Sequence, residues 1–236
     1  MNRLKIFSIS ALALFIALGC NQAESNPAGT NTMNSINGTD DVSFSAVIDS
    51  LAVIGTDSLS ADEISGLLFM REEEKLARDV YAVLGADFNA RVFLAITQSE
   101  QRHMDAVKIL IDRYELADPI DGRPAGVFAD HELQALYDAL LLKGKQNPAD
   151  AYAAGAAIEE VDIVDLQKRL ALTDNDDIAF VYNNLMRGSR NHLRAFVRNL
   201  SSQGITYIPK YLSQTEFDQI IASGNERGRG YRQGRN

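Results

Sequence analysis

Cysteine is almost absent from this 236-residue chain, which contains only Cys20. A disulfide bond within the chain is therefore impossible. An excess of positive charge is also lacking, because 23 Lys and Arg stand against 32 Asp and Glu and leave a formal net charge of −9. Nucleic-acid-binding proteins usually have a basic surface, so we expect no nucleic-acid partner. An acidic chain is instead compatible with a soluble protein that attracts cations.

Strand-like alternation and repeats of solenoid length are missing too, and helical periodicity begins at residue 60. Capping patterns mark helix starts at Ser60 with Glu63, at Thr173 with Asp176, and at Ser213. The sequence predicts long helices at about 60–84, 89–114, 148–172 and 174–202, and short ones at about 130–144 and 213–222. Short links join the first two and the last two long helices, whereas a long connection joins the second to the third. We therefore predict an all-α fold, a ferritin-like four-helix bundle with a long crossover and a short C-terminal helix, in a domain of residues 60–223.

The first 19 residues have the pattern of a secretory signal peptide, with a short basic start followed by an apolar run. That run is too short to predict a membrane span. Cys20 follows Gly19 directly, which resembles a bacterial lipoprotein signal, although Ala17 and Leu18 depart from its usual order. We predict a bacterial, exported, membrane-anchored lipoprotein that carries a lipid on Cys20 and faces the periplasm or the cell exterior. The alternative is an ordinary cleaved signal with an incidental cysteine.

Two further segments have low apolar content. Residues 20–59 are rich in Asn, Ser, Thr and Gly and predict a flexible tether. Within them, residues 42–55 pack loosely on the domain or form a short strand or helix, and the sequence does not decide which. Residues 224–236 are rich in Gly and Arg, and we expect a disordered tail rather than a surface that binds anions or lipid.

Polar residues interrupt the apolar stripes of the long helices near their middles. Glu100 and His103 interrupt the second stripe, Glu74 the first, and Ser189 with His192 the fourth. Burying an ionised carboxylate without a partner is very costly. A metal ion removes that cost, since it supplies the opposite charge and binds the imidazole lone pair. The repeated pattern therefore predicts a metal site inside the bundle.

The third long helix is less decisive. One of Glu159 and Glu160 should face inward, and the helical wheel slightly favours Glu160, whereas Asp162 and Asp165 are turned further toward solvent. On the first helix, the charged run that begins at Arg71 should be solvent-facing apart from Glu74 and, less clearly, Glu73.

A buried polar network without metal is the competing interpretation. In that case Arg78 or Arg190 would supply the counter-charge, and the polar layer would fix the register of the bundle. The protein would then be a non-catalytic interaction module. Coordinates discriminate between the two, because only the network requires an arginine that points into the layer.

Several blocks of the chain resemble the DUF2202 family of ferritin-like proteins over about residues 60–222: "GLLFMREEEKLARDVY", "SEQRHMDAVKILIDRY", "GAAIEEVDIVDL", "VYNNLMRGSRNHLRAF" and "YIPKYLSQTEFDQII". The resemblance implies a ferritin-like bundle but no established activity. The wider superfamily, rubrerythrin-like proteins included, places Glu, Glu-x-x-His, Glu and Glu-x-x-His on its four helices in order. "EKLARDVY" is similar to the rubrerythrin pattern and selects Glu74 over Glu73. Ser189 departs from the pattern, since the superfamily has a carboxylate there.

This resemblance implies an iron or manganese site formed by Glu74, Glu100, His103, His192 and one residue of the third helix, either Glu160 or Glu159. The missing carboxylate at Ser189 leaves a mononuclear and a dinuclear site both open. Tyr81 should lie close enough to be a redox or hydrogen-bonding neighbour. A rubredoxin-type iron centre is excluded, because the chain has no cysteine cluster. The expected function is an exported metal-binding protein, with an iron- or manganese-dependent oxidoreductase as its specific form.

Overall fold

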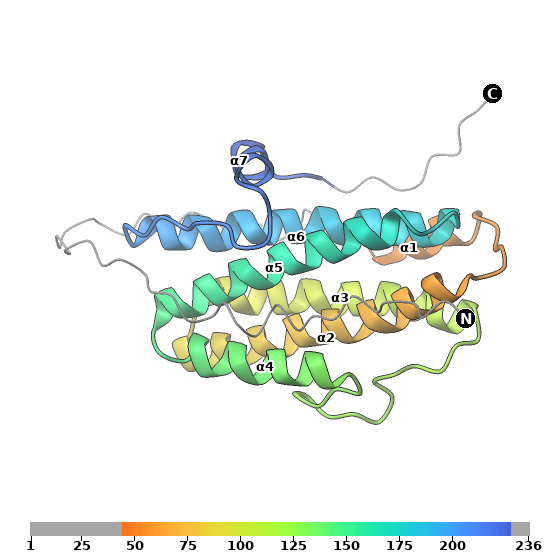
Figure 1. Ribbon diagram of the computed structural model, residues 1–236, viewed down its shortest axis with the longest axis horizontal. Coiled ribbons are helices and arrows are strands. Elements are labelled where there is room, and N and C mark those ends of the chain that lie inside the picture. Colours follow the sequence, from red (N-terminus) through yellow and green to blue (C-terminus); the bar gives the residue numbers. More distant parts are fainter. Residues whose placement is uncertain (1–43, 228–236) are drawn as a thin grey trace, which may run out of the picture.

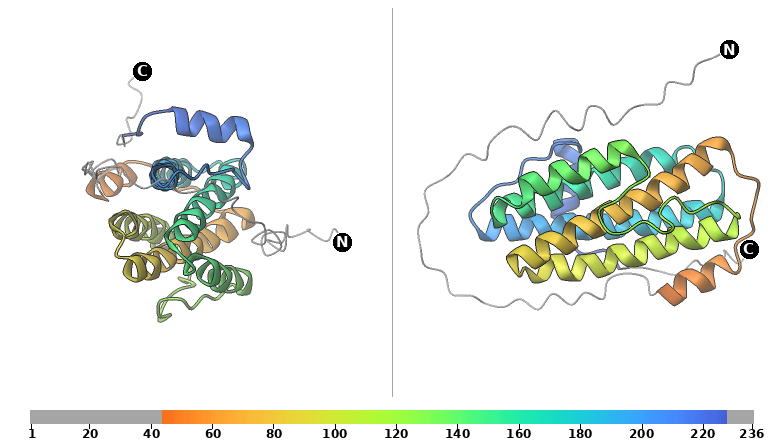
Figure 2. Two further views of the ribbon diagram at one scale, coloured as in Figure 1. Left: turned by 90° about the vertical axis from the view of Figure 1, so that its left-hand side faces the viewer. Right: turned by 90° about the horizontal axis from the view of Figure 1, so that it is seen from below.

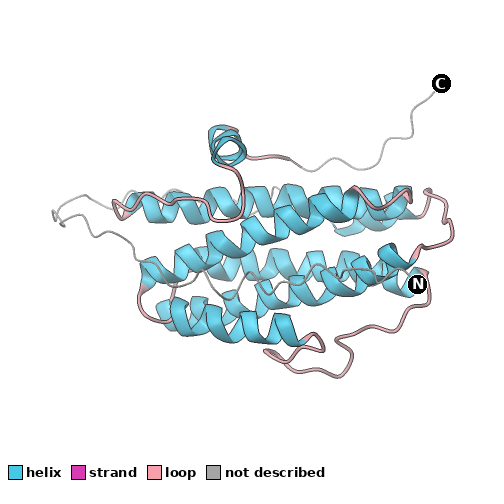
Figure 3. Ribbon diagram, viewed as in Figure 1, coloured by secondary structure: helices cyan, strands magenta, loops and turns pink. Residues whose placement is uncertain are grey.

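The computed structural model describes residues 44–227, and all of their regular secondary structure is helical (Figures 1 and 3). The predicted signal peptide, the anchor residue Cys20, the first part of the tether and the last nine residues lie outside the described residues. The helices are α1 (Phe44–Leu51), α2 (Ala61–Phe88), α3 (Arg91–Arg113), α4 (His131–Gly144), α5 (Pro148–Leu170), α6 (Asp176–Ser202) and α7 (Gln214–Ala222). No helix of this range is both long and apolar enough to cross a membrane.

Two antiparallel helix pairs form the bundle. Helices α2 and α3 make one pair, α5 and α6 the other, and further contacts between α3 and α6 and between α2 and α5 close the bundle (Figures 1 and 2). Helix α4 packs against α2 and α5 within the long connection between the pairs, and α7 packs against α6. The predicted all-α four-helix bundle with its long crossover and short C-terminal helix is confirmed.

Local capping explains where the helices of the first pair begin and end. Ser60 accepts a hydrogen bond from the Glu63 backbone N–H and donates its own N–H to the Glu63 carboxylate, which is the predicted capping box. The helix ends at Asn89, which has a left-handed backbone with φ of 49°. Asparagine tolerates this conformation better than most residues, so α2 and α3 are joined by a tight turn.

The predicted cap at Thr173 is wrong. Helix α6 begins two residues later than expected and has Asn175 in the cap position, without a side-chain cap bond. The Thr173 hydroxyl instead donates to the Glu63 carboxylate (2.6 Å), and the Asn175 amide donates to the same oxygen (2.8 Å). The turn between α5 and α6 is thereby fastened to the first turn of α2, a long-range contact that outweighs the local capping pattern.

Part of the predicted tether is folded. Residues 44–51 form α1, which decides the open question about residues 42–55 in favour of a helix. Val47, Leu51 and Ile54 are buried, and Arg113 of α3 donates hydrogen bonds to two carbonyls of this segment. The segment that precedes α2 is therefore docked against α3 as far as residue 54.

The charged run on α2 is also buried, contrary to expectation, because the long connection before α4 passes over α2 (Figure 2, right). Arg71 pairs with Asp118 of that connection at 3.0 Å. Lys75 donates to the Pro124 carbonyl at 2.9 Å, and Glu72 accepts the backbone N–H groups of residues 129 and 130. These bonds hold the crossover against the outer face of α2.

An aromatic layer lies within the bundle core. The rings of Tyr81, Phe93 and Phe196 contact one another with centroid distances of 5.1–5.8 Å. Gly155 of α5 faces this layer, and a Cβ atom there would lie 2.7 Å from the Phe196 ring. A larger residue would therefore push α5 away from α6, so this glycine allows the two helices to pack closely.

Candidate metal centre

Four helices bring together five buried side chains, which we call the Glu/His cluster: Glu74 from α2, Glu100 and His103 from α3, Glu159 from α5 and His192 from α6. Two groups have ligand atoms that all lie within 4.8 Å of one another, one of Glu74, Glu100 and His103, the other of Glu100, Glu159 and His192. Because Glu100 belongs to both groups, the cluster has the layout of two adjacent sites that share one carboxylate.

The distances place Glu100 between the two imidazoles. His103 Nδ1 lies 2.8 Å from Glu100 Oε2 and 3.2 Å from Glu74 Oε2. His192 Nδ1 lies 2.9 Å from Glu100 Oε1 and 3.5 Å from Glu159 Oε2. The two rings are 5.5 Å apart and nearly parallel. Each oxygen of Glu100 therefore faces one imidazole, so the two halves of the cluster are arranged alike around it.

Several polar atoms of the cluster are buried without a hydrogen-bond partner. These atoms are Glu74 Oε1, Glu100 Oε1, His103 Nε2 and His192 Nδ1. The close approach of His192 Nδ1 to Glu100 Oε1 is thus a short contact without hydrogen-bond alignment. Buried polar atoms in proteins are nearly always paired. Carboxylate oxygens and imidazole nitrogens are ligands that iron, manganese and zinc accept, so the donor set fits a bound metal.

The charges within the cluster are strongly coupled. Burial alone would raise the pKa of Glu100, but the imidazoles of His192 and His103 outweigh it and hold that pKa well below its usual range. Burial would lower the pKa of His192, yet Glu100 and Glu159 raise it to about 10. His103 has its pKa raised in the same way by Glu74 and Glu100. The shared carboxylate is therefore ionised and both imidazoles are protonated in the absence of a metal.

The outer carboxylates of the cluster behave differently. Burial raises the pKa of Glu74 to about 7, against the opposing effect of His103. Burial likewise raises the pKa of Glu159 to about 7, against the opposing effect of His192. These two groups therefore lack sufficient counter-charge, which a divalent cation would supply.

Asp162 is a neighbour of the cluster that the sequence pattern missed. It is 6% exposed, although the helical wheel turned it toward solvent. The Ser189 hydroxyl hydrogen-bonds Asp162 Oδ2 and also lies 3.0 Å from the Leu185 carbonyl oxygen. The other oxygen, Oδ1, is buried without a partner. No local pattern predicts this burial, because it depends on the packing of α6 and Ser189 over Asp162.

Glu160 does not join the cluster, which corrects the sequence preference for it over Glu159. Its carboxylate is fully buried but accepts hydrogen bonds from the segment that precedes α7. The donors are the Tyr207 hydroxyl and the backbone N–H groups of Lys210, Tyr211 and Leu212, at 2.5–2.9 Å for the shortest contact of each. Glu160 thus anchors that segment to α5.

Neither arginine of the competing network enters the cluster. Arg78 pairs with Asp79 at 2.6 Å and donates to Gln101. Arg190 pairs with Glu226 at 2.5 Å. Arg78 and Arg190 therefore do not neutralise the carboxylates of the cluster in the way the network interpretation requires.

Tyr81 lies where the sequence placed a hydrogen-bonding neighbour. Its hydroxyl donates to Glu159 Oε1 at 2.6 Å and lies 3.3 Å from the Gly155 carbonyl. Burial, reinforced by Glu159 and Glu100, raises the pKa of Tyr81 well above its usual value. Tyr81 is thus a neutral phenol that orients Glu159.

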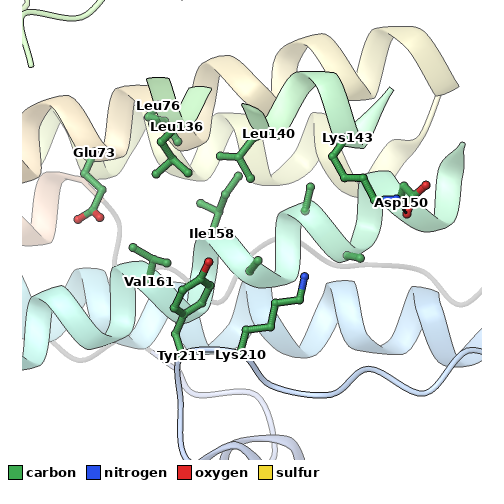
Figure 4. A pocket seen from close by; sticks show the side chains of 13 residues that line it. Glu73, Leu76, Leu136, Leu140, Lys143, Asp150, Ile158, Val161, Lys210 and Tyr211 are labelled. Atoms are coloured by element: carbon green, nitrogen blue, oxygen red, sulfur yellow. Dashed lines mark ion pairs between the residues drawn. The ribbon is translucent and has the colours of Figure 1, made fainter. Parts of the chain in front are cut away.

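Glu73 precedes Glu74 but points to a different region, a cavity of about 70 Å³ between α2, α4 and α5 (Figure 4). Leu76, Leu136 and Ile158 line its middle, and a Lys143–Asp150 ion pair of 3.0 Å lies toward its far end. Both Glu73 oxygens are buried without a partner. Burial, then Asp165 and Asp162, raises the pKa of Glu73 well above its usual value.

Comparison with known proteins places the helical domain among proteins of unassigned activity. Residues 63–224 match the family described as "Uncharacterized protein domain (DUF2202)". The chain is 50% identical to the uncharacterized protein MJ0754 of Methanocaldococcus jannaschii over 170 residues, which are 72% of this chain and 92% of that protein. A crystal structure of hypothetical protein MJ0754 aligns with a TM-score of 0.72 and 48% identity, covering 73% of this chain and 99% of that one.

Proposed function

We propose that this chain, which belongs to the DUF2202 family, is a ferritin-like protein that binds two iron or manganese ions in the Glu/His cluster. The observation that carries the proposal is the pair of ligand groups that share Glu100, together with their unpartnered buried atoms. Helical bundles with inward Glu and Glu-x-x-His residues are the usual scaffold of such carboxylate sites.

The residues divide into two sets around the shared carboxylate. Glu74 and His103 would hold one ion, Glu159 and His192 the other, and Glu100 would bridge both. Tyr81 fixes the orientation of Glu159 through its hydrogen bond. All five side chains of the cluster are buried, so bulk water has little access to them.

We further propose that the protein is an oxidoreductase. Iron or manganese in such a carboxylate site supplies electron-transfer chemistry toward O2 or peroxide. The support from this chain is the neutral Tyr81 phenol beside the cluster and the number of carboxylates that face inward. The chain offers no cysteine cluster, so the electron donor has to come from outside it.

Metal analysis of purified protein tests the binding proposal. After anaerobic reconstitution with Fe(II), Mn(II) or Zn(II) and desalting, we expect two ions per chain by elemental mass spectrometry. The Glu100→Ala His103→Ala double variant should retain none. The matched control is His131→Ala Glu132→Ala, which removes the same residue types from the exposed start of α4 and should retain two. A wild-type chain that retains no metal would contradict the proposal.

The redox proposal needs a separate measurement. Fe(II)-loaded protein should consume O2 or peroxide faster than free Fe(II) at the same concentration, and the Glu100→Ala His103→Ala variant should not. A loaded protein with two tightly bound ions and no such acceleration would limit the function to metal binding.

We also propose that the exported chain is anchored through lipid on Cys20. The support is the sequence pattern before that residue, which lies outside the described residues. Expression in a bacterium with labelled fatty acid should label the wild type and leave Cys20→Ala unlabelled. A soluble, unlabelled wild-type product would contradict the anchor.

A further inference from the structure

We propose that Asp162 is an additional metal ligand, which supplies from α5 the carboxylate that α6 lacks at Ser189. The inference rests on the proposed metal-binding function and extends its ligand set. It answers the question raised by Ser189, which stands where a second Glu-x-x-His motif would have its glutamate.

The antiparallel packing of α5 and α6 places the two residues opposite each other. In an antiparallel pair, a step toward the C-terminus of one helix corresponds to a step toward the N-terminus of the other. Glu159 faces His192, with 3.5 Å between Oε2 and Nδ1. Three residues further along α5, Asp162 meets Ser189, which lies three residues earlier on α6. Asp162 of α5 therefore lies opposite Ser189 of α6, where a second Glu-x-x-His motif would have its carboxylate.

The environment of Asp162 is that of a ligand rather than of a surface aspartate. Its carboxylate is nearly inaccessible to solvent, and Oδ1 has no hydrogen-bond partner. A buried carboxylate oxygen that lacks a hydrogen-bond donor is unfavourable unless a cation compensates for it. The unpartnered Oδ1 of Asp162 is therefore the atom that would bind the ion.

Ser189 acquires a defined role in this arrangement. It is fully buried, and its hydroxyl fixes one oxygen of Asp162 while the other oxygen remains available. Hydrogen bonds from neighbours of this kind orient metal ligands and strengthen binding. Ser189 is therefore a positioning residue, and the small side chain also leaves room for the Asp162 carboxylate.

Moving the carboxylate back to α6 tests the inference. We would compare the wild type, Asp162→Asn, Asp162→Ser, and the swap variant Asp162→Ser Ser189→Glu. Each is titrated with Co(II), and the readouts are bound ions per chain and visible absorption of the Co(II) site. Asp162→Asn and Asp162→Ser should weaken binding of at least one ion by about 10–100-fold. The swap variant should recover the wild-type stoichiometry.

Asp165→Asn is the matched control, because Asp165 lies about one helical turn after Asp162 on α5 and pairs with Lys168. It should bind as the wild type does. Wild-type stoichiometry and affinity in Asp162→Asn would overturn the inference while leaving the metal-binding function intact. A swap variant that binds no better than Asp162→Ser would overturn it as well, and circular dichroism of each variant verifies that it is folded. A wild type that binds no Co(II) would instead contradict the proposed function.

Discussion

Glu159 and Glu160 are adjacent on α5 and almost equally buried, yet they have opposite surroundings. Glu160 accepts hydrogen bonds from one tyrosine hydroxyl and three backbone N–H groups of residues 207–212. Glu159 accepts one from Tyr81 and otherwise faces His192 and the shared carboxylate Glu100. Adjacent residues of a helix point in directions that differ by ~100°, and this difference makes Glu160 a structural anchor and Glu159 a candidate ligand.

The difference shows how buried carboxylates can be sorted. A carboxylate surrounded by donors contributes to stability because its desolvation is offset by charge-assisted hydrogen bonds. A buried carboxylate whose neighbours supply too little positive charge, as at Glu74 and Glu159, reduces the stability of the metal-free protein. Such a group is retained where a ligand compensates for it.

The largest effect is expected from Glu160→Ala, which removes the acceptor of four donors, of which the Tyr207 hydroxyl and the Leu212 N–H are buried. We expect the free energy of unfolding to fall by about 3–5 kcal/mol, since each unsatisfied buried donor costs about 1–3 kcal/mol and local relaxation recovers part of that. Urea denaturation of metal-free protein measures the change. Segment 207–212 should also become susceptible to proteolysis.

Glu159→Ala is the matched variant for that experiment. Because Glu159 has little compensation in the metal-free protein, its removal should cost less than about 1 kcal/mol there. Equal losses in the two variants would show that the anchor and the cluster do not differ in the way argued above.

Sequence patterns alone placed four members of the cluster correctly in the bundle interior. Glu74, Glu100, His103 and His192 each interrupt an apolar stripe, and that periodicity depends only on the helix itself. The identity of the metal and the ligand role of each residue stay predictions. The all-α bundle and its crossover also follow from helix lengths and link lengths.

The remaining positions depend on contacts that no local pattern contains. Glu160 is separated from Glu159 only by its partners, which lie about 50 residues later in the chain. Asp162 is buried because α6 packs over it and Ser189 meets it. The charged run on α2 is buried because a loop without periodicity covers it. In each case tertiary contacts, and not the helical periodicity of the sequence, determine the burial and the partners of the residue.

Metal binding should have the second-largest effect, and it should act on the cluster alone. A ligand at 100 times its dissociation constant stabilises the folded state by about 2.7 kcal/mol. We therefore expect Mn(II) or Zn(II) to raise the free energy of unfolding of the wild type by about that amount. Glu100→Ala should show no such gain, because Glu100 belongs to both ligand groups. A gain of the same size in Glu100→Ala would place the stabilising metal elsewhere.

The Glu/His cluster and Glu63, in the first turn of α2, should respond to pH with opposite signs. In the metal-free protein, Glu74 and Glu159 have pKa values raised from 4.5 to about 7, so the folded state binds their protons more tightly than the unfolded state. Their contribution to stability is therefore lost as the pH rises from about 4.5 to 7. Glu63 has its pKa lowered to about 2, since hydrogen bonds from Thr173, the Ser60 backbone N–H and Asn175 together outweigh its burial. Its contribution is present above about pH 4.5 and is lost as the pH falls toward 2.

Urea denaturation of metal-free protein at a series of pH values measures both parts of the profile, an upper limb between pH 4.5 and 7 and a lower limb below pH 4.5. In each limb we expect the free energy of unfolding to change by about 1–2 kcal/mol. Glu74→Gln Glu159→Gln should flatten the limb between pH 4.5 and 7, and Glu63→Gln the limb below pH 4.5. A profile that keeps its upper limb in the double variant would assign that limb to other groups.

The smallest effect is expected from replacing two neighbouring glutamates of α2, Glu72 and Glu73. Like Glu160 and Glu159 on α5, one of them has hydrogen-bond donors around its carboxylate and the other lacks them. Glu73 lines a cavity together with the apolar side chains of Leu76 and Ile158 and has both oxygens unpartnered, whereas Glu72 accepts two backbone N–H groups. Glu73→Met should raise the free energy of unfolding at pH 7 by about 1 kcal/mol, because an apolar chain of similar length replaces a group that must bind a proton to be buried. Glu72→Met, its matched control, should lower that free energy by a similar or larger amount.

Because the stability gained in Glu73→Met comes from avoided protonation, it should shrink as the pH is lowered toward 4.5. A gain that does not depend on pH would mean that packing alone explains it.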